Sequence, residues 1–479
     1  MNPESTGDEL RPEIRQLADF PEKLGPVLVK ELRQGLRTHA FTLLLSALLL
    51  GLTLATLAFT ANNRSGQSDG SELSTLIFTL YGLTALILQP LRGLTALSSE
   101  SKARTIDLLL LTRLTSWRIA FGKWSSLFTQ TLLLLSTILP FLIMRYFLGG
   151  MNLAAELFTL VFLTYLSAIF TALAIGLSGH QSTLLRFILP ALFLFLGLPL
   201  LINLFSFIAP GDLFDLFTGS PGASLLTGTL AFFLGTLYLA YHSLENGAAS
   251  IAPPAENLAT RRRLTAAAYF LLGILPLAPH HPTAFLSLSL ILISLLAFDL
   301  LEEANFQPAP VCRSFLRFHT AGRLLGRLLY PGWATGTLYL LLLLALTLLA
   351  LRTTPLKTTH LPIFLTISGH LLLCALASRL LATRYPRPRA LILILTIASF
   401  LISFLLTLQN LTTTSSSDIT HLPFVPLPLT QLNILYDENL RAKTLLPLAL
   451  VNLIYLLLLA PPLHRALRAI RQHEENATG

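Results

Sequence analysis

The chain carries little charge and almost no cysteine. Only 12% of its 479 residues are Asp, Glu, Lys or Arg, about half the share of a typical soluble domain. Its two cysteines, Cys312 and Cys374, lie far apart, so we expect neither a disulfide framework nor a paired-cysteine metal site. The first 38 residues have no apolar core behind a short basic start, which argues against a cleavable signal peptide.

Motifs of nucleotide hydrolysis and of common enzyme classes are also missing. The Gly122-Lys123 pair lacks the upstream glycine of a phosphate-binding loop, so the chain is not expected to hydrolyse ATP itself. No His-Glu-x-x-His motif is present. We therefore expect no catalytic residue, no metal site and no bound cofactor.

Long apolar runs dominate the sequence, since 53% of the residues are hydrophobic. A run of about 20 apolar residues crosses the hydrocarbon core as a helix. The runs are continuous and Leu-rich rather than alternating, which disfavours a β-barrel. The prediction is an all-α integral membrane protein with about twelve transmembrane helices. The predicted spans are 40–60, 73–97, 124–146, 157–178, 187–208, 225–245, 264–279, 283–301, 333–351, 361–381, 390–409 and 445–463.

Lys and Arg are distributed unevenly between the loops. With the amino terminus inside, the outer segments hold six of the 33 basic residues: Arg64, Arg145, Arg352, Lys357, Arg441 and Lys443. The positive-inside rule therefore predicts a multi-pass protein of the cell membrane, the inner membrane in a bacterium, with both termini cytoplasmic. The net charge of +9 is explained by this topology and by anionic lipid. It requires no nucleic acid partner.

The spans fall into two groups. The predicted organisation is a cytoplasmic tail with an interfacial helix (1–38), a six-helix unit (39–245), a cytoplasmic linker (246–263), a second, diverged six-helix unit (264–463) and a cytoplasmic tail (464–479). In each half the longest cytoplasmic loop lies between the second and third spans, at 98–123 and 302–332. This positional repeat suggests two related units.

The segment from Glu22 to Arg37 has the pattern of a helix lying in the headgroup plane. Its apolar residues follow helical spacing, and basic residues gather on another face. The residues assigned to this interfacial helix are Lys30, Glu31, Arg33 and Arg37. The alternative is a basic flank that only sets the topology.

The loop from Ser98 to Lys123 carries more apolar side chains than a loop facing only water would. An exposed apolar patch of this kind usually marks an interface with protein or membrane. Here the sequence resembles the type-2 ATP-binding-cassette (ABC) transporter permease family. The matching positions are Glu100, Thr105, Asp107, Leu108 to Leu110, Leu114, Thr115, Ile119, Gly122 and Lys123. The stretch Leu28 to Arg33 also resembles the family, whereas Arg104 and Arg113 replace its usual glycine and proline.

The resemblance is strongest over residues 24–245. It implies a membrane-spanning permease subunit of an ATP-driven transporter, an exporter, which acts with a separate ATPase subunit. In that family this segment includes the coupling helix, which docks into the ATPase. The resemblance thus implies this role for about Thr105 to Trp117. The residues assigned to the coupling segment are Glu100, Thr105, Asp107, Leu110, Leu114, Trp117, Gly122 and Lys123. A lipid-facing helix or solvated loop is the alternative.

Two other function classes stay open. A secondary carrier would need charged residues in mid-span, and a polytopic enzyme or assembly factor for lipid or cell-wall precursors would need clustered polar residues at one membrane face. The substrate and the pairing with a second permease chain stay open as well.

Two further patterns concern the helices. Arg313 to Tyr330 predicts a basic amphipathic helix or helix pair, either a counterpart of the coupling segment or an interfacial anchor. On the first span, a stripe of hydroxyl side chains predicts a helix-packing face, with the lining of a substrate path as the alternative. This stripe consists of Thr42, Ser46, Thr53, Thr56 and Thr60.

Overall fold

The computed structural model of the chain describes its long helices and some of their connections. The described residues are 26–62, 70–98, 114–148, 152–179, 214, 223–253, 256–301, 303, 309–352, 360–381, 392, 394–396, 398–399 and 438–478. Within these ranges the regular structure is helical and no strand is present. Together with the apolar character of the long helices, this confirms an all-α membrane protein.

Eight helices in the described ranges are long and apolar enough to cross a membrane. They are His39–Ala61, Ser71–Ser98, Ser116–Phe147, Leu153–Ser178, Pro282–Leu300, Trp333–Arg352, His360–Leu380 and Leu445–Glu475. Each overlaps one predicted span, so eight of the twelve predicted spans correspond to helices of spanning length.

The other four predicted spans are not among these eight helices. Span 187–208 lies outside the described residues, and only isolated positions of 390–409 are described. Span 225–245 lies on helix α12 (Ala223–Ile251). Span 264–279 begins on α13 (Leu258–Tyr269) and continues as a π-helical turn, η3 (Phe270–Ile274), and a 3-10 turn, η4 (Leu275–Leu277). Pro276 lies in this last turn, where its missing N–H prevents a regular α-helix.

The chain divides into two compact units. Unit 1 comprises Met1–Leu225 and Thr236–Pro253, and unit 2 comprises Leu226–Gly235 and Pro254–Gly479. Helix α12 therefore contributes residues to both units.

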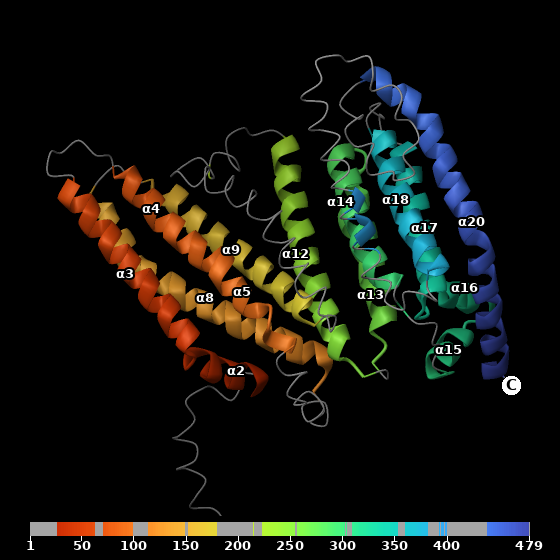
Figure 1. Cartoon of the computed structure of the whole chain (residues 1–479), viewed down its shortest axis with the longest axis horizontal. Coiled ribbons are helices and arrows are strands. Elements are labelled where there is room, and N and C mark those ends of the chain that lie inside the picture. Colours follow the sequence, from red (N-terminus) through yellow and green to blue (C-terminus); the bar gives the residue numbers. More distant parts are fainter. Residues whose placement is uncertain are drawn as a thin grey trace, which may run out of the picture. The chain divides into compact units, whose positions relative to one another are not determined.

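Unit 1 is a bundle of long helices preceded by one short helix (Figure 1). In chain order its elements are α2 (Pro26–Leu36), α3 (His39–Asn62), α4 (Ser71–Gly82), η2 (Leu83–Leu88), α5 (Gln89–Gly93), α8 (Ser116–Phe147), α9 (Leu153–Ser178) and the second half of α12. The fully buried Leu52, Phe78 and Leu134 belong to one core formed by α3, α4, α8 and α9.

The hydroxyl stripe predicted on the first span lies mostly on the exposed face of α3. Of the five hydroxyl residues in its stripe only Thr56 is buried, and the other four are exposed. The hydroxyls of Thr53, Thr56 and Thr60 donate to carbonyls of their own helix. Within the chain only Thr56 of the stripe packs inside the bundle, and for the other four residues the packing role stays a prediction, because periodicity identifies a common face and not what covers it.

The second spanning helix is regular only in its first half. Residues Leu83–Leu88 form the π-helical turn η2, and Pro90 follows at the start of α5. Proline has no N–H and its ring crowds the carbonyl four residues before it, so a wider turn at this point relieves the conflict. Such π turns are frequent at functional sites, and this one immediately precedes Arg92.

Unit 2 contains α13, α14 (Pro282–Leu300), α15 (Ala309–Leu316), α16 (His319–Leu329), α17 (Trp333–Arg352), α18 (His360–Leu380) and α20 (Glu438–Thr478). Helix α14 packs against α17 and α18, and α18 packs along α20. Helix α20 has 41 residues and is about 60 Å long at 1.5 Å per residue, about twice the hydrocarbon thickness. Towards its end α20 packs beside α15 (Figure 1), and Ile470 belongs to the same apolar cluster as Cys312 of α15.

Candidate functional site

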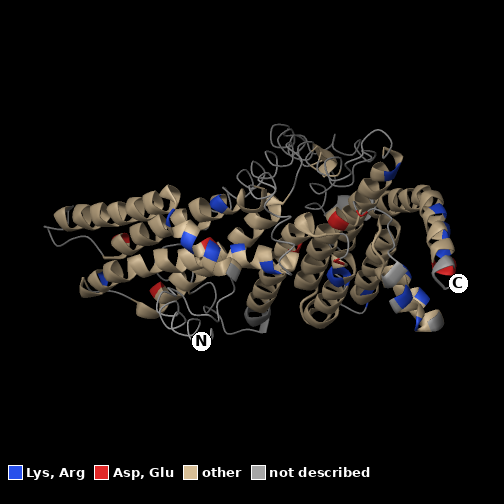
Figure 2. Cartoon of the chain, turned by 90° about the horizontal axis from the view of Figure 1, so that it is seen from below, with Lys and Arg blue, Asp and Glu red and all other residues tan. Residues whose placement is uncertain are grey.

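The candidate site lies in unit 1, where the short helix α2 crosses the first half of α8. Helix α2 is amphipathic: Leu32 is buried, whereas Lys30 and Arg33 are exposed. Figure 2 shows that the charged residues of the described helices are few and mostly Lys and Arg. The short helix thus presents a basic surface and packs its apolar side on the bundle.

A glycine allows α2 and α8 to approach closely. A Cβ on Gly122 of α8 would lie 2.7 Å from Cγ1 and 3.1 Å from Cβ of Val27. Valine has a stiff, branched side chain, so a larger residue at 122 would force the two helices apart. Gly122, one of the residues assigned to the coupling segment, therefore lies at the contact between the helices.

Next to this contact, an ion pair connects the same two helices. Lys123 Nζ donates to Glu31 Oε1 at 3.0 Å, and the two side chains are 6% and 18% exposed. A charge-assisted hydrogen bond shielded in this way is stronger than one on an open surface. We call Val27, Glu31, Gly122 and Lys123 the α2–α8 latch.

The beginning of α8 is held on its other side by aromatic residues. Trp117 packs on Tyr241 of α12 with ring centroids 5.2 Å apart, and Trp124 Nε1 donates to the carbonyl of Ala168 in α9 at 2.9 Å. Leu114, Trp117 and Trp124 all pack against one apolar cluster, which includes Ile119 of α8 and Ile169 of α9. The first turns of α8 are therefore connected to α2 on one side and to α9 and α12 on the other.

The structure changes the predicted boundary between the loop and the third span. Helix α8 begins at Ser116, eight residues before the predicted span at 124, because the Thr115 hydroxyl caps it by accepting from Arg118 N at 3.4 Å. Trp117 thus belongs to the spanning helix and is half-buried within unit 1. It does not lie on a separate short helix.

The predicted site residues fall into four groups. The latch brings together Glu31, Gly122 and Lys123; Leu114 and Trp117 pack on the other side of α8. Lys30, Arg33 and Arg37 are exposed at α2. Glu100, Thr105, Asp107 and Leu110 lie outside the described residues.

Arg92 is a component of this region that the sequence reasoning missed. It follows the π turn, is half-buried and donates through Nη1 to Gln130 Oε1 at 2.6 Å and to Gln89 Oε1 at 3.0 Å. The position of Arg92 within the predicted span 73–97 could have identified it, because ionisable residues inside a span are functional candidates by default.

Two buried ionic clusters hold other parts of the chain together. In unit 1, Arg145 Nε donates to Ser74 Oγ at 2.8 Å, and Ser74 Oγ donates to Glu156 Oε1 at 2.9 Å. In unit 2, Arg263 is fully buried, pairs with Glu303 and donates to the Gly332 carbonyl at 3.1 Å. Burial raises the pKa of the Glu303 carboxyl, and the nearby Arg263 guanidinium opposes this shift. Both clusters join separate helices and have the character of structural contacts.

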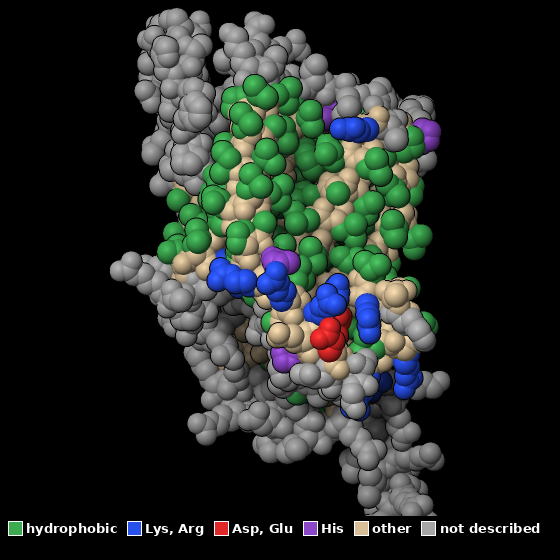
Figure 3. All heavy atoms as spheres, turned by 90° about the vertical axis from the view of Figure 1, so that its right-hand side faces the viewer, with side chains coloured by type: hydrophobic (Ala, Val, Ile, Leu, Met, Phe, Trp, Pro, Cys, Tyr) green, Lys and Arg blue, Asp and Glu red, His purple; other side chains and the backbone are tan. Residues whose placement is uncertain are grey.

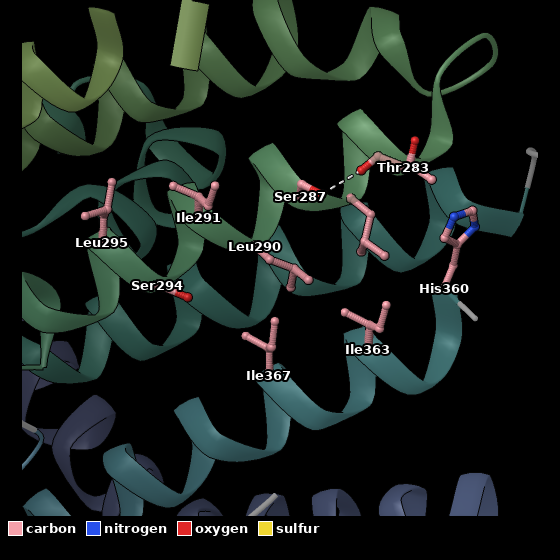
Figure 4. A pocket seen from close by; sticks show the side chains of 10 residues that line it. Thr283, Ser287, Leu290, Ile291, Ser294, Leu295, His360, Ile363 and Ile367 are labelled. Carbon is pink, nitrogen blue, oxygen red and sulfur yellow. Dashed lines mark hydrogen bonds between the residues drawn. The ribbon is translucent and has the colours of Figure 1, made fainter. Parts of the chain in front are cut away.

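Unit 2 also contains a groove of about 450 Å³ between α14 and α18 (Figure 4). Its lining includes Leu290, Ile291, Ile363 and Ile367, with His360 near one end. The Ser287 hydroxyl in its wall donates to the Thr283 carbonyl of its own helix at 2.8 Å. The groove is therefore mostly apolar and offers few groups that could take part in acid–base chemistry.

The segment from Arg313 to Tyr330 contains a helix pair. Helices α15 and α16 pack together, and α16 joins α20 through Arg327 and Glu474 at 3.2 Å. Leu324 and Leu325 are exposed beside the exposed Arg323. On this side of the chain, a belt of apolar side chains lies next to a band of Lys and Arg (Figure 3). This arrangement is typical of the boundary between hydrocarbon and headgroups.

Among the residues that the structure describes, no group of three or more His, Cys, Asp or Glu side chains could hold a metal ion. No protein-family model matches the chain, and comparison with curated proteins and with solved structures gave no match.

Proposed function

We propose that the chain is the membrane-spanning permease subunit of an ATP-driven ABC exporter, powered by a separate ATPase subunit. The motif resemblance of residues 24–245 supports this assignment. The chain itself lacks a phosphate-binding loop, so the partner supplies nucleotide hydrolysis.

The α2–α8 latch is the observation that best supports the proposal. A permease driven from outside needs a rigid element that receives a displacement and passes it to spanning helices. Here the start of α8 contacts α2 through Lys123 and α12 through Trp117. A displacement of the segment that precedes α8 would therefore be transmitted to α2 and α12 as well as to α8.

Within this proposal, the coupling segment has two parts. Thr105, Asp107 and Leu110 contact the ATPase, whereas Leu114, Trp117, Gly122 and Lys123 transmit the displacement inside the bundle. Leu114 and Trp117 are half-buried in unit 1, and this supports a transmitting role for them rather than a docking role.

The proposed orientation places α2, the start of α8 and both termini on the cytoplasmic side of the cell membrane. The excess of Lys and Arg in the predicted inner segments supports it. A partner that uses cellular ATP would then meet the chain at the α2–α8 side.

Co-purification tests the proposal. The tagged full chain, extracted from its native membrane in mild detergent, should retain a protein with a phosphate-binding loop, and the complex should hydrolyse ATP while the chain alone does not. Replacement of the loop lysine in that partner should abolish turnover. Recovery of the intact chain without such a partner, or ATP hydrolysis by the pure chain, would overturn the assignment.

A pair of substitutions locates the contact. Leu110→Asp should release the partner, because a charge would enter an apolar interface without a counter-ion. The matched control is Thr112→Asp, since position 112 lies about 200° around a helix from position 110. Equal retention of the ATPase by both variants would exclude Leu110 from the contact.

A further inference from the structure

A polar cavity of about 360 Å³ lies beside the α2–α8 latch. Gln34 and Thr38 line it at the end of α2, Arg92 and Thr95 at the end of the second spanning helix, and Lys123 and Gln130 on α8. The volume falls within the range of about 300–1,000 Å³ typical of small-molecule sites. The lining is rich in hydrogen-bond donors.

Among the described residues that line the cavity, Arg92 and Lys123 are cationic and Glu31 is acidic. The Lys123 ammonium faces the Glu31 carboxylate, whereas the Arg92 guanidinium bonds only neutral groups, namely the side chains of Gln89, Gln130 and Thr38. In the described parts of the chain no carboxylate forms an ion pair with Arg92. A half-buried cation without a counter-ion is costly, and a bound anion would offset this cost.

Arg92 is held in place before any ligand arrives. Gln89 is fully buried, accepts from Arg92 and donates through Nε2 to the Leu127 carbonyl at 2.9 Å. Gln130 accepts from the same guanidinium nitrogen. Gly35 of α2 lies against the Gln130 amide, where a Cβ would overlap it. A fixed guanidinium loses little freedom on binding, which favours a specific site.

We propose that this cavity binds the phosphate group of an anionic membrane lipid. A guanidinium matches phosphate geometry and forms charge-assisted hydrogen bonds with it. The neighbouring α2 is an amphipathic helix with exposed basic residues, as expected for a helix at headgroup level. The bilayer is therefore the nearest source of phosphate, and this inference does not depend on the ABC assignment.

Lipid titration of the purified full chain in detergent micelles tests the site, with binding followed by native mass spectrometry. Four probes separate the sources: short-chain phosphatidylglycerol, phosphatidylcholine, a fatty acid without phosphate, and inorganic phosphate. Phosphatidylglycerol should bind at least tenfold more tightly than the other three. Preferential binding of inorganic phosphate, equal binding of all lipids or no binding would overturn the lipid site.

Arg92→Gln should weaken phosphatidylglycerol binding at least tenfold, because it removes the charge but keeps hydrogen-bond donors. Arg92→Lys should retain most of it. Arg118→Gln, the same change at an exposed position of α8 outside the cavity lining, should stay within twofold of the original chain. If Arg92→Gln does not fold, Thr95→Trp serves instead. It obstructs the cavity from an exposed lining position and should reduce binding similarly. Unchanged binding by a folded Arg92→Gln or Thr95→Trp variant would rule out the cavity.

Discussion

The ammonium group of Lys123 on α8 lies 3.0 Å from a carboxylate oxygen of Glu31 on α2, although 92 residues separate them in the chain. Both helices carry residues of the motif resemblance. The ion pair therefore joins two stretches of the chain that are far apart in sequence and that resemble the same family.

Reversal of this pair tests the latch. Glu31→Lys and Lys123→Glu should each lower the free energy of unfolding by about 1.5–3 kcal/mol, the usual contribution of a charge-assisted hydrogen bond. The double exchange should recover part of the loss, because opposite charges again face each other. Thermal unfolding in detergent measures the effect, with Arg118→Glu at an exposed site as the control. Additive losses in the double exchange would mean that the two residues do not interact.

Gly122 provides a second test, based on packing alone. Alanine normally favours a helix over glycine by about 1 kcal/mol, yet Gly122→Ala should destabilise the protein because its Cβ would press on Val27. The control is Gly228→Ala on α12, where a Cβ would meet nothing within 4 Å, and it should be neutral or stabilising. Unfolding temperatures compare the two variants. A gain in stability at both positions would contradict the close contact of α2 and α8.

The buried cluster of Arg145, Ser74 and Glu156 gives a third prediction. Glu156→Gln keeps the side-chain shape but removes the charge next to Arg145, whose side chain is 1% exposed. Loss of one partner from a buried ionic contact costs about 3–5 kcal/mol, so a large fall in unfolding temperature is expected. Glu72→Gln on the exposed face of α4 should change stability by less than about 0.5 kcal/mol. Similar small effects of both changes would show that the Glu156 charge is not needed.

The fourth prediction concerns orientation. Helix α8 has 32 residues and is about 48 Å long, so its two ends should lie on opposite sides of the membrane. Arg118→Cys and Tyr146→Cys place thiols at exposed positions near these ends. An impermeant maleimide should label Tyr146→Cys in intact cells and Arg118→Cys only after permeabilisation. Cys312 and Cys374 are buried, so background labelling should be low. The reverse pattern would invert the topology.

Sequence patterns predict the spanning helices better than the contacts between them. Apolar runs identified all eight helices of spanning length in the described part of the chain, because an uninterrupted run is a local property. The start of α8 was misplaced, since the cap at Thr115 and the packing of Trp117 on Tyr241 extend the helix beyond the apolar run.

The candidate site was predicted only in part for a similar reason. Glu31 and Lys123 were both selected, but their pairing depends on how α2 folds back on α8. Arg92 was overlooked because it lies within an apolar run and its partner Gln130 is 38 residues away. Local spacing contains no information about such a partner.

The length of α20 fixes how deep the helix pair α15–α16 can sit. A helix of about 60 Å cannot be contained in a hydrocarbon layer of about 30 Å. The residues of α20 that hold the pair, Ile470 and Glu474, lie in its last third. We therefore expect the apolar stretch of α20 to span the bilayer, with the helix pair α15–α16 bound to the C-terminal part of α20 that follows this stretch. We also expect the exposed Leu324 and Leu325 to lie near the boundary between acyl chains and headgroups, and we expect membrane thickness to shift the pair along the bilayer normal.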